Sequence, residues 1–275
     1  MKKSILSICT LIFLFACKKD NSNTPSSTGK TLTSIWTNDL SGSNVLTVDS
    51  LSYDNNGRLL RIIQWDYDNT QASALYDSII WKFTYNGSGN NPSTYSTTFY
   101  YAADNNESYT EDHTLSYDNQ GRVIFDTSLA VYTSGSVSRE SYFKYTAAYT
   151  VINQAAAHKD ITDTILMNNG NISKFSAYAD SLGTGNFDFG YAYTYAGTPN
   201  PLYNITISAG IGPLLYVRTD LDFISKYLPA TSKDIFYAPD LVYSYTANSL
   251  GLPVKGSAKD RTTGKLEKSI TYNYQ

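Results

Sequence analysis

The side chains best suited to metal chemistry lie at residues 111 to 113, where Glu111, Asp112 and His113 follow one another. Carboxylate and imidazole groups are common metal ligands. On a β-strand, however, neighbouring side chains point to opposite faces, so Asp112 would face away from Glu111 and His113. The only other histidine, His158, lies far along the chain. We therefore expect no metal site and no cofactor.

Carboxylate pairs are the other candidates for chemistry. Asp160 and Asp163 could in principle serve as the acid and base of a glycosidase. That role needs two carboxyl groups that converge across a cleft, which closeness in sequence does not provide. The chain also lacks a GxSxG nucleophile motif. The sequence favours a protein that is not an enzyme, with no catalytic residue.

Two similar segments, DNNGR from residue 54 and DNQGR from residue 118, could offer oxygen ligands to calcium through Asp54 and Asp118. They lack the further carboxylates of a calcium loop. Gly57 and Gly121 fit a tight turn instead, because glycine readily adopts positive φ at the end of a type I turn. We interpret all four residues as structural turn residues.

The first residues have the pattern of an export signal. Two lysines precede an apolar run over residues 5–15, which is too short to span a bilayer as a helix. The run ends in LFAC and resembles the lipobox of bacterial lipoproteins. This resemblance implies that residues 1–16 are removed and that Cys17 carries diacylglycerol, which would anchor the protein to the outer membrane. The alternative is an ordinary signal peptide with an unrelated cysteine.

The polar stretch that follows suggests a tether. Residues 17–32 are rich in Ser, Asn and Pro and contain little that could be buried, so we expect disorder there and a folded domain over 33–275. Removing Lys2 and Lys3 with the signal changes the formal charge from −3 to −5. This mild acidity argues against a nucleic-acid partner. Cys9 leaves with the signal, so no thiol remains for a disulfide.

The domain repeats itself. LSYDNNGRLLRI over 51–62 and LSYDNQGRVIFD over 115–126 match closely, and Tyr53, Tyr85 and Tyr117 are spaced 32 residues apart. Such a period indicates one supersecondary unit used again. Each unit has alternating strands around a tight turn, and no recurring helix separates them. The sequence predicts an all-β antiparallel meander of twelve to fourteen strands, curved or closed into a barrel, with one short helix near residues 220–228.

These features resemble a known family. The YDNxGR turns are similar to YD repeats, and YTYAGTPNPLY and YSYTANSLGLPVK are similar to segments of Bacteroidetes outer-membrane lipoproteins whose domain of unknown function has a porin-like β fold. The resemblance covers most of residues 33–275. It implies a β-meander on a lipid tether and carries over no activity, cofactor or catalytic residue. Whether the protein faces the periplasm or the cell surface stays open.

Aromatic residues make up 14% of the chain, and FDFGYAYTY over 187–195 places one at every second position. We expect those rings to face the interior. A membrane-spanning barrel is disfavoured, because the middle of a lipid-facing strand should carry Leu, Val and Ala rather than tyrosine. Five other aromatics could instead form an exposed platform for a glycan: Trp65, Tyr67, Tyr95, Tyr100 and Tyr101.

Three functions remain open at this point. The first is a non-enzymatic lipoprotein whose β domain binds or scaffolds a partner at the envelope, which could be a glycan, a lipid or an envelope protein. The second is a carrier with a lipid or other apolar molecule in the barrel interior, since barrels of more than about eight strands have more interior than side chains can fill. The third is a glycan-binding protein with rings outside. Alternation alone does not say which face is out.

Overall fold

The structure is a computed structural model, and it describes residues 31–41, 45–68, 74–101, 108–132, 134–146, 149–156, 159–180, 187–203, 205, 208–219, 221–234 and 239–275. The expected signal, Cys17 and the tether up to residue 30 lie outside these ranges. Within them, no helix is both long enough and apolar enough to cross a membrane.

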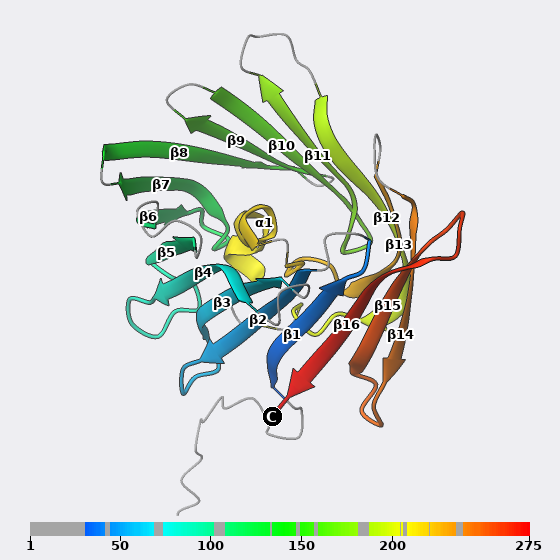
Figure 1. Cartoon of the computed structure of the whole chain (residues 1–275). Helices are drawn as coiled ribbons and strands as arrows, with labels where there is room; N and C mark the ends of the chain where they lie inside the picture. Colours follow the sequence, from blue (N-terminus) through cyan, green and yellow to red (C-terminus); the bar gives the residue numbers. More distant parts are fainter. Residues whose placement is uncertain are drawn as a thin grey trace, which may run out of the picture.

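The chain forms an all-β antiparallel meander in which each strand pairs with its neighbours in sequence (Figure 1). The first and last strands also pair over seven registered positions, so the sheet closes into a barrel. The elements are β1(Leu32–Asp39), β2(Val45–Tyr53), β3(Leu59–Asp68), β4(Ala74–Thr84), β5(Thr94–Tyr101), β6(Tyr109–Tyr117), β7(Val123–Tyr132), β8(Gly135–Tyr145), β9(Tyr149–Ala156), β10(Lys159–Asn168), β11(Asn171–Asp180), β12(Phe187–Pro199), α1(Ser208–Thr219), β13(Tyr227–Asp234), β14(Leu241–Ala247), β15(Pro253–Asp260) and β16(Leu266–Tyr274).

The expected number of twelve to fourteen strands is wrong, because the closed sheet runs from β1 to β16. Residues 145 to 165 account for part of the difference. They contain no Asn/Gly turn motif, yet β9 and β10 pair there over eight positions. Cross-strand pairing, which sequence does not reveal, defines these strands.

The predicted turns are present. Gly57 has φ of 76° and Gly121 of 75°, and each donates its N–H to the carbonyl oxygen of the turn's aspartate, at 3.0 Å. Asp54 Oδ1 accepts the backbone N–H of Arg58 at 2.8 Å, and its Oδ2 accepts Arg58 Nε at 2.7 Å. Asp118 binds Arg122 in the same way. These bonds stabilise the charged forms and lower the pKa of both carboxyl groups, although burial of Asp54 opposes this.

The repeated tyrosines stand at one end of the barrel, which we call the tyrosine end. Each hydroxyl ties together the two open strand ends of a hairpin: Tyr53 donates to Leu32 O at 2.9 Å and Tyr85 to Leu59 O at 2.7 Å. The arginines of the repeat link adjacent hairpins, since Arg58 lies 4.3 Å from the ring centroid of Tyr85. The same bond is made by the hydroxyls of Tyr117, Tyr145, Tyr195 and Tyr274. The tyrosines and arginines of the sequence repeat therefore hold neighbouring strands together at this end of the barrel.

A third turn of this kind offers a test of the glycine geometry. Gly251 has φ of +76° and an added Cβ would meet nothing within 4 Å, so Gly251→Ala introduces backbone strain without a clash. We expect it to lower the free energy of unfolding by about 1–2 kcal/mol in urea titration. Gly89 is the control, because it has equal space and no positive φ. Gly89→Ala should cost less than about 0.5 kcal/mol, and equal costs would contradict the account.

Between β12 and β13, the described residues 200–203, 205, 208–219 and 221–226 form a plug segment at the tyrosine end. It carries α1, which lies inside the ring of strands (Figure 1). Asn200 Nδ2 donates to Asp222 O and Ser225 O, at 2.7 and 2.9 Å. At Gly210 an added Cβ would lie 2.4 Å from Gly121 O, so α1 begins against the second YDNxGR turn.

The helix expected near residues 220–228 is wrong in position, since α1 spans Ser208–Thr219 and β13 begins at Tyr227. Within the expected range, Asp222 caps a turn by accepting N–H bonds from Ile224 and Ser225 at 2.9 and 2.8 Å. The true helix has Pro213 inside it and no acidic residue in its first turn. Burial of Ile211, Leu214 and Leu215 within the barrel stabilises it, a tertiary effect without a local sequence signal.

Candidate functional site

The barrel interior contains a cavity of about 570 Å³ above the plug segment. Pockets of this size commonly hold one small-molecule ligand. The plug supplies the floor through Asn200, Leu202, Tyr216 and Leu221. The walls come from β1, β10 to β14 and β16, and their aromatic residues are Phe175, Tyr191, Tyr193, Tyr195, Tyr243, Tyr245 and Tyr272.

The stretch over residues 187–195 supplies part of this wall. Tyr191 pairs with Phe175 across β11 and Tyr193 pairs with Ser232 across β13, and all four side chains line the cavity. The expected inward orientation is thus confirmed for Tyr191, Tyr193 and Tyr195. The side chains of Phe187 and Phe189 lie outside the described part of the chain.

Most polar groups deep in the cavity are already bonded within the protein. The hydroxyls of Tyr193 and Tyr216 lie 2.9 Å apart, and those of Ser232 and Tyr243 3.1 Å apart. Tyr195 OH donates to Ile172 O at 2.6 Å. Burial raises the pKa of the Tyr193 and Tyr243 phenols and of the Asp222 carboxyl, because it penalises their charged forms. These hydroxyls are engaged within the protein, while the tyrosine rings line the cavity.

The other side of the interior, along β2 to β7, is filled. Leu59, Ile62 and Trp81 are at most 1% exposed and belong to one hydrophobic cluster with Leu214 and Leu215 of α1. The barrel is therefore packed on one side and hollow on the other.

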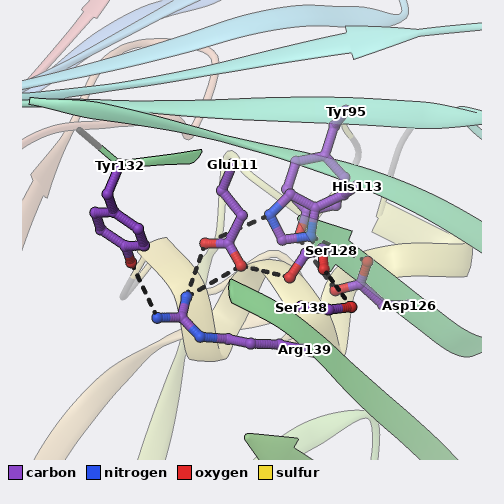
Figure 2. Close-up of polar contacts among 8 residues, drawn as sticks. All are labelled: Tyr95, Glu111, His113, Asp126, Ser128, Tyr132, Ser138 and Arg139. Atoms are coloured by element: carbon purple, nitrogen blue, oxygen red, sulfur yellow. Dashed lines mark hydrogen bonds and ion pairs between the residues drawn. The ribbon is translucent and has the colours of Figure 1, made fainter. Parts of the chain in front are cut away.

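A buried polar cluster lies on β5 to β8 (Figure 2). His113 Nδ1 donates to the Asp126 carboxylate, 3.0 Å from Oδ1, and the His113 ring stacks on Tyr95 with centroids 3.9 Å apart. Ser128 donates its hydroxyl to Glu111, whose carboxylate also accepts two bonds from Arg139 Nη1 at 3.1 Å. His113 and Asp126 are at most 3% exposed.

This cluster resembles a hydrolytic site only in its residue types. The Ser128 hydroxyl is bonded to Glu111, and His113 Nε2 faces Glu111 Oε2 at 3.9 Å. A serine nucleophile must donate the hydrogen bond of its hydroxyl to the histidine that would take the proton. The bonds between these groups instead satisfy polar side chains on a buried wall.

Breaking the cluster tests this structural role. Glu111→Gln removes the charge that faces Arg139, and we expect unfolding free energy to fall by about 2–3 kcal/mol. This is below the value for a fully buried pair, because the Arg139 side chain is 30% exposed and solvent screens it. The double variant Glu111→Met with Arg139→Met should recover most of the loss in urea titration. A double variant less stable than Glu111→Gln would contradict the assignment.

Sequence reasoning placed some of these residues correctly. Glu111 and His113 face inward and Asp112 is exposed, as strand alternation predicted. Among the described residues no three His, Cys, Asp or Glu side chains come together in a way that could hold a metal. Asp163 lines the cavity. His158 and the side chain of Asp160 lie outside the described part.

The five candidate platform aromatics do not share one face. Tyr95 is 3% exposed and points inward beside His113, and Tyr101 pairs with Asp77 on the same inner face. Trp65, Tyr67 and Tyr100 belong to the outer face. There Trp65 lies in a row of paired residues that runs from Trp36 through Val48 and Ser78 to Tyr100.

Several site residues gave no signal in the sequence. Asp126, Ser128 and Arg139 look like ordinary polar strand residues, and only pairing shows that they share the inner face with Glu111. Lys268 likewise lines the cavity although nothing near it forms a motif. These residues could have been identified from the sequence only if the inward-facing side of each strand had been known.

The comparisons with known proteins concern the fold. No family model matches the chain, and no curated protein matches it. Among solved structures, a porin-like protein from Bacteroides uniformis superposes with a TM-score of 0.54 at 13% identity, covering 90% of this chain and 98% of that one. A porin-like protein from Bacteroides vulgatus gives 0.51 at 14% identity, with 90% and 99% covered. The chain therefore has the porin-like β fold that the resemblance implied.

Proposed function

We propose that this protein is a non-enzymatic lipoprotein of the bacterial envelope that carries an apolar ligand inside its barrel. The cavity of about 570 Å³ is the observation that supports the proposal. A barrel that served only as a scaffold would gain stability by filling that space, since unfilled apolar volume is costly. Here one side is packed and the other is left hollow behind a wall of rings.

The outer face supports a location outside the hydrocarbon of the bilayer. This face carries exposed charges away from the ends of its strands, namely Lys82 on β4, Asp112 on β6, Glu140 on β8 and Lys255 on β15. A spanning barrel carries an apolar band there, and a lysine at the bilayer midplane costs about 2–4 kcal/mol. The fold is porin-like, but these charged positions interrupt the apolar outer band that a spanning porin carries.

A lipid on Cys17 would then hold the barrel at the outer membrane. Thr31 pairs with Gln275 at the tyrosine end, so the tether reaches the barrel at its plugged end and the cavity extends away from it. Cys17→Ser should move the protein from the membrane fraction to the soluble fraction, whereas Cys9→Ser should leave it bound. Equal fractionation of both variants would remove the anchor from the proposal.

The test of the carrier role uses a cavity-filling variant. Ala177 is 2% exposed and lines the cavity, so Ala177→Phe should occupy ligand space and abolish the fluorescence gain of an apolar environment-sensitive dye. Thr246→Phe adds the same ring at an exposed position on β14 and is the matched control. Dye binding that survives Ala177→Phe unchanged would exclude the cavity as its site.

A glycan-binding surface is the second candidate, favoured by the outward row. Trp36 is 47% exposed and Tyr100 48% exposed in this row, and sugars stack on such rings. Retention of the protein on immobilised polysaccharides, lost in Trp36→Ala, would support it. Equal retention of the wild type and Trp36→Ala would exclude this row.

A further inference from the structure

Among the residues that the structure describes, Lys268 is the one cation of the cavity wall, and it lies at the end away from the plug. Lys268 is the third residue of β16, whose other end carries Tyr274 at the tyrosine end. Its register partners are Ala258 on β15 and Asp39 on β1. Its side chain therefore stands near the rim of the cavity, and the small Ala258 leaves room beside it.

Lys268 makes no hydrogen bond or ion pair with any residue that the structure describes. The nearest carboxylate in register, Asp39, uses Oδ1 to accept the backbone N–H and the hydroxyl of Ser41, at 2.8 and 2.6 Å. A half-buried ammonium group beside apolar surface is stabilised by an anionic partner.

The two other charged residues of the cavity wall do not compete for this role. Asp222 caps its own turn at the floor through Ile224 N–H and Ser225 N–H. Asp163 is 2% exposed and has interactions of its own, so a ligand has little access to it. Below Lys268 the hydroxyls of Tyr193, Tyr216 and Tyr243 are bonded within the protein, which leaves ring surface for a hydrocarbon chain.

From this arrangement we infer that the ligand is a single-chain amphiphile with an anionic head group, which Lys268 binds while the chain lies along the tyrosines toward the plug. The inference rests on the proposed carrier function and adds the chemical class of its ligand. A carboxylate and a phosphate monoester share the chemistry that the ammonium group recognises.

Calorimetric titration with palmitate, hexadecyl phosphate and hexadecanol tests this, because the three share a chain and differ in head group. We expect one or both anions to bind about tenfold to a hundredfold more tightly than the alcohol. Lys268→Met keeps the apolar stem and should remove that preference without weakening hexadecanol. Lys259→Met, which removes an exposed lysine from β15, is the control and should retain the preference.

The outcomes separate this inference from the function on which it rests. Equal affinity of wild type for all three compounds, or a preference that survives Lys268→Met, overturns the assignment of Lys268 while the carrier function stands. Should none of the compounds bind and the apolar dye also fail, the carrier function itself is lost. If Lys268→Met does not fold, titration of the wild type at low and high salt still tests the assignment. A charge contact with Lys268 predicts that high salt weakens binding of the anions and leaves binding of hexadecanol unchanged.

Discussion

Raising the pH above about 10 is expected to unfold the barrel in one steep transition. Burial raises the pKa of many tyrosines above the usual value of about 10, because the phenolate is penalised away from water. The affected residues along the barrel wall, the tyrosine end and α1 are Tyr53, Tyr85, Tyr109, Tyr117, Tyr145, Tyr193, Tyr195, Tyr216, Tyr243, Tyr245, Tyr272 and Tyr274.

The sign follows from linkage. A folded-state pKa above the unfolded value contributes stability that is fully present below about pH 10 and is lost as the pH rises further. Each buried phenol that ionises only on unfolding costs up to about 1.4 kcal/mol per pH unit. The half-buried phenols of Tyr109 and Tyr274 contribute less, because solvent screens them. Several together exceed the 5–15 kcal/mol stability of a typical domain within about two pH units.

Two spectroscopic signals check this result. Tyrosinate absorbance and loss of the far-ultraviolet circular dichroism should appear together, since the buried phenols ionise only when the barrel opens. A gradual rise of tyrosinate absorbance from about pH 10 with an intact β spectrum would mean that the rings are in water, contrary to their placement in the wall and at the tyrosine end.

Replacing Trp81 by alanine is the substitution with the largest expected cost. Trp81 is 1% exposed in the packed side of the barrel, so its loss should lower the unfolding free energy by about 3–5 kcal/mol. Tyr191 is the comparison, because its half-buried ring borders the existing cavity. Tyr191→Ala enlarges a space that is already there and should cost less, about 1–2 kcal/mol.

Urea unfolding of both variants measures the asymmetry of the barrel. A larger loss for Trp81→Ala supports one packed and one hollow side. Similar losses of about 3–5 kcal/mol would mean that the tyrosine wall is packed as tightly as the Trp81 side, and the cavity would then be too small for a ligand.

The parts of the fold that sequence predicted are those that depend on local rules. Alternation predicted the strands around each turn, and the glycine of YDNxGR predicted the turn, because pleat and positive φ are properties of a few consecutive residues. The 32-residue spacing of the tyrosines likewise follows from one hairpin per repeat.

The parts that failed depend on contacts between distant segments. The helix at Ser208–Thr219 forms because the barrel buries it, and strands β9 and β10 exist because each pairs with a neighbour. The cavity could not be predicted for the same reason, because its lining residues come from distant segments. Tyr193 and Lys268 are 75 positions apart in the chain and meet in one cavity wall only after the sheet has closed.

The most direct test of the carrier function is a native mass spectrum of the Cys17→Ser protein, purified from cells without detergent. The account predicts a species heavier than the polypeptide by several hundred daltons, roughly the mass of a drug-sized ligand, which disappears when the protein is denatured. A spectrum showing only the bare chain, together with failure of the apolar dye to bind, would mean that the rings pack on one another and that the barrel carries nothing.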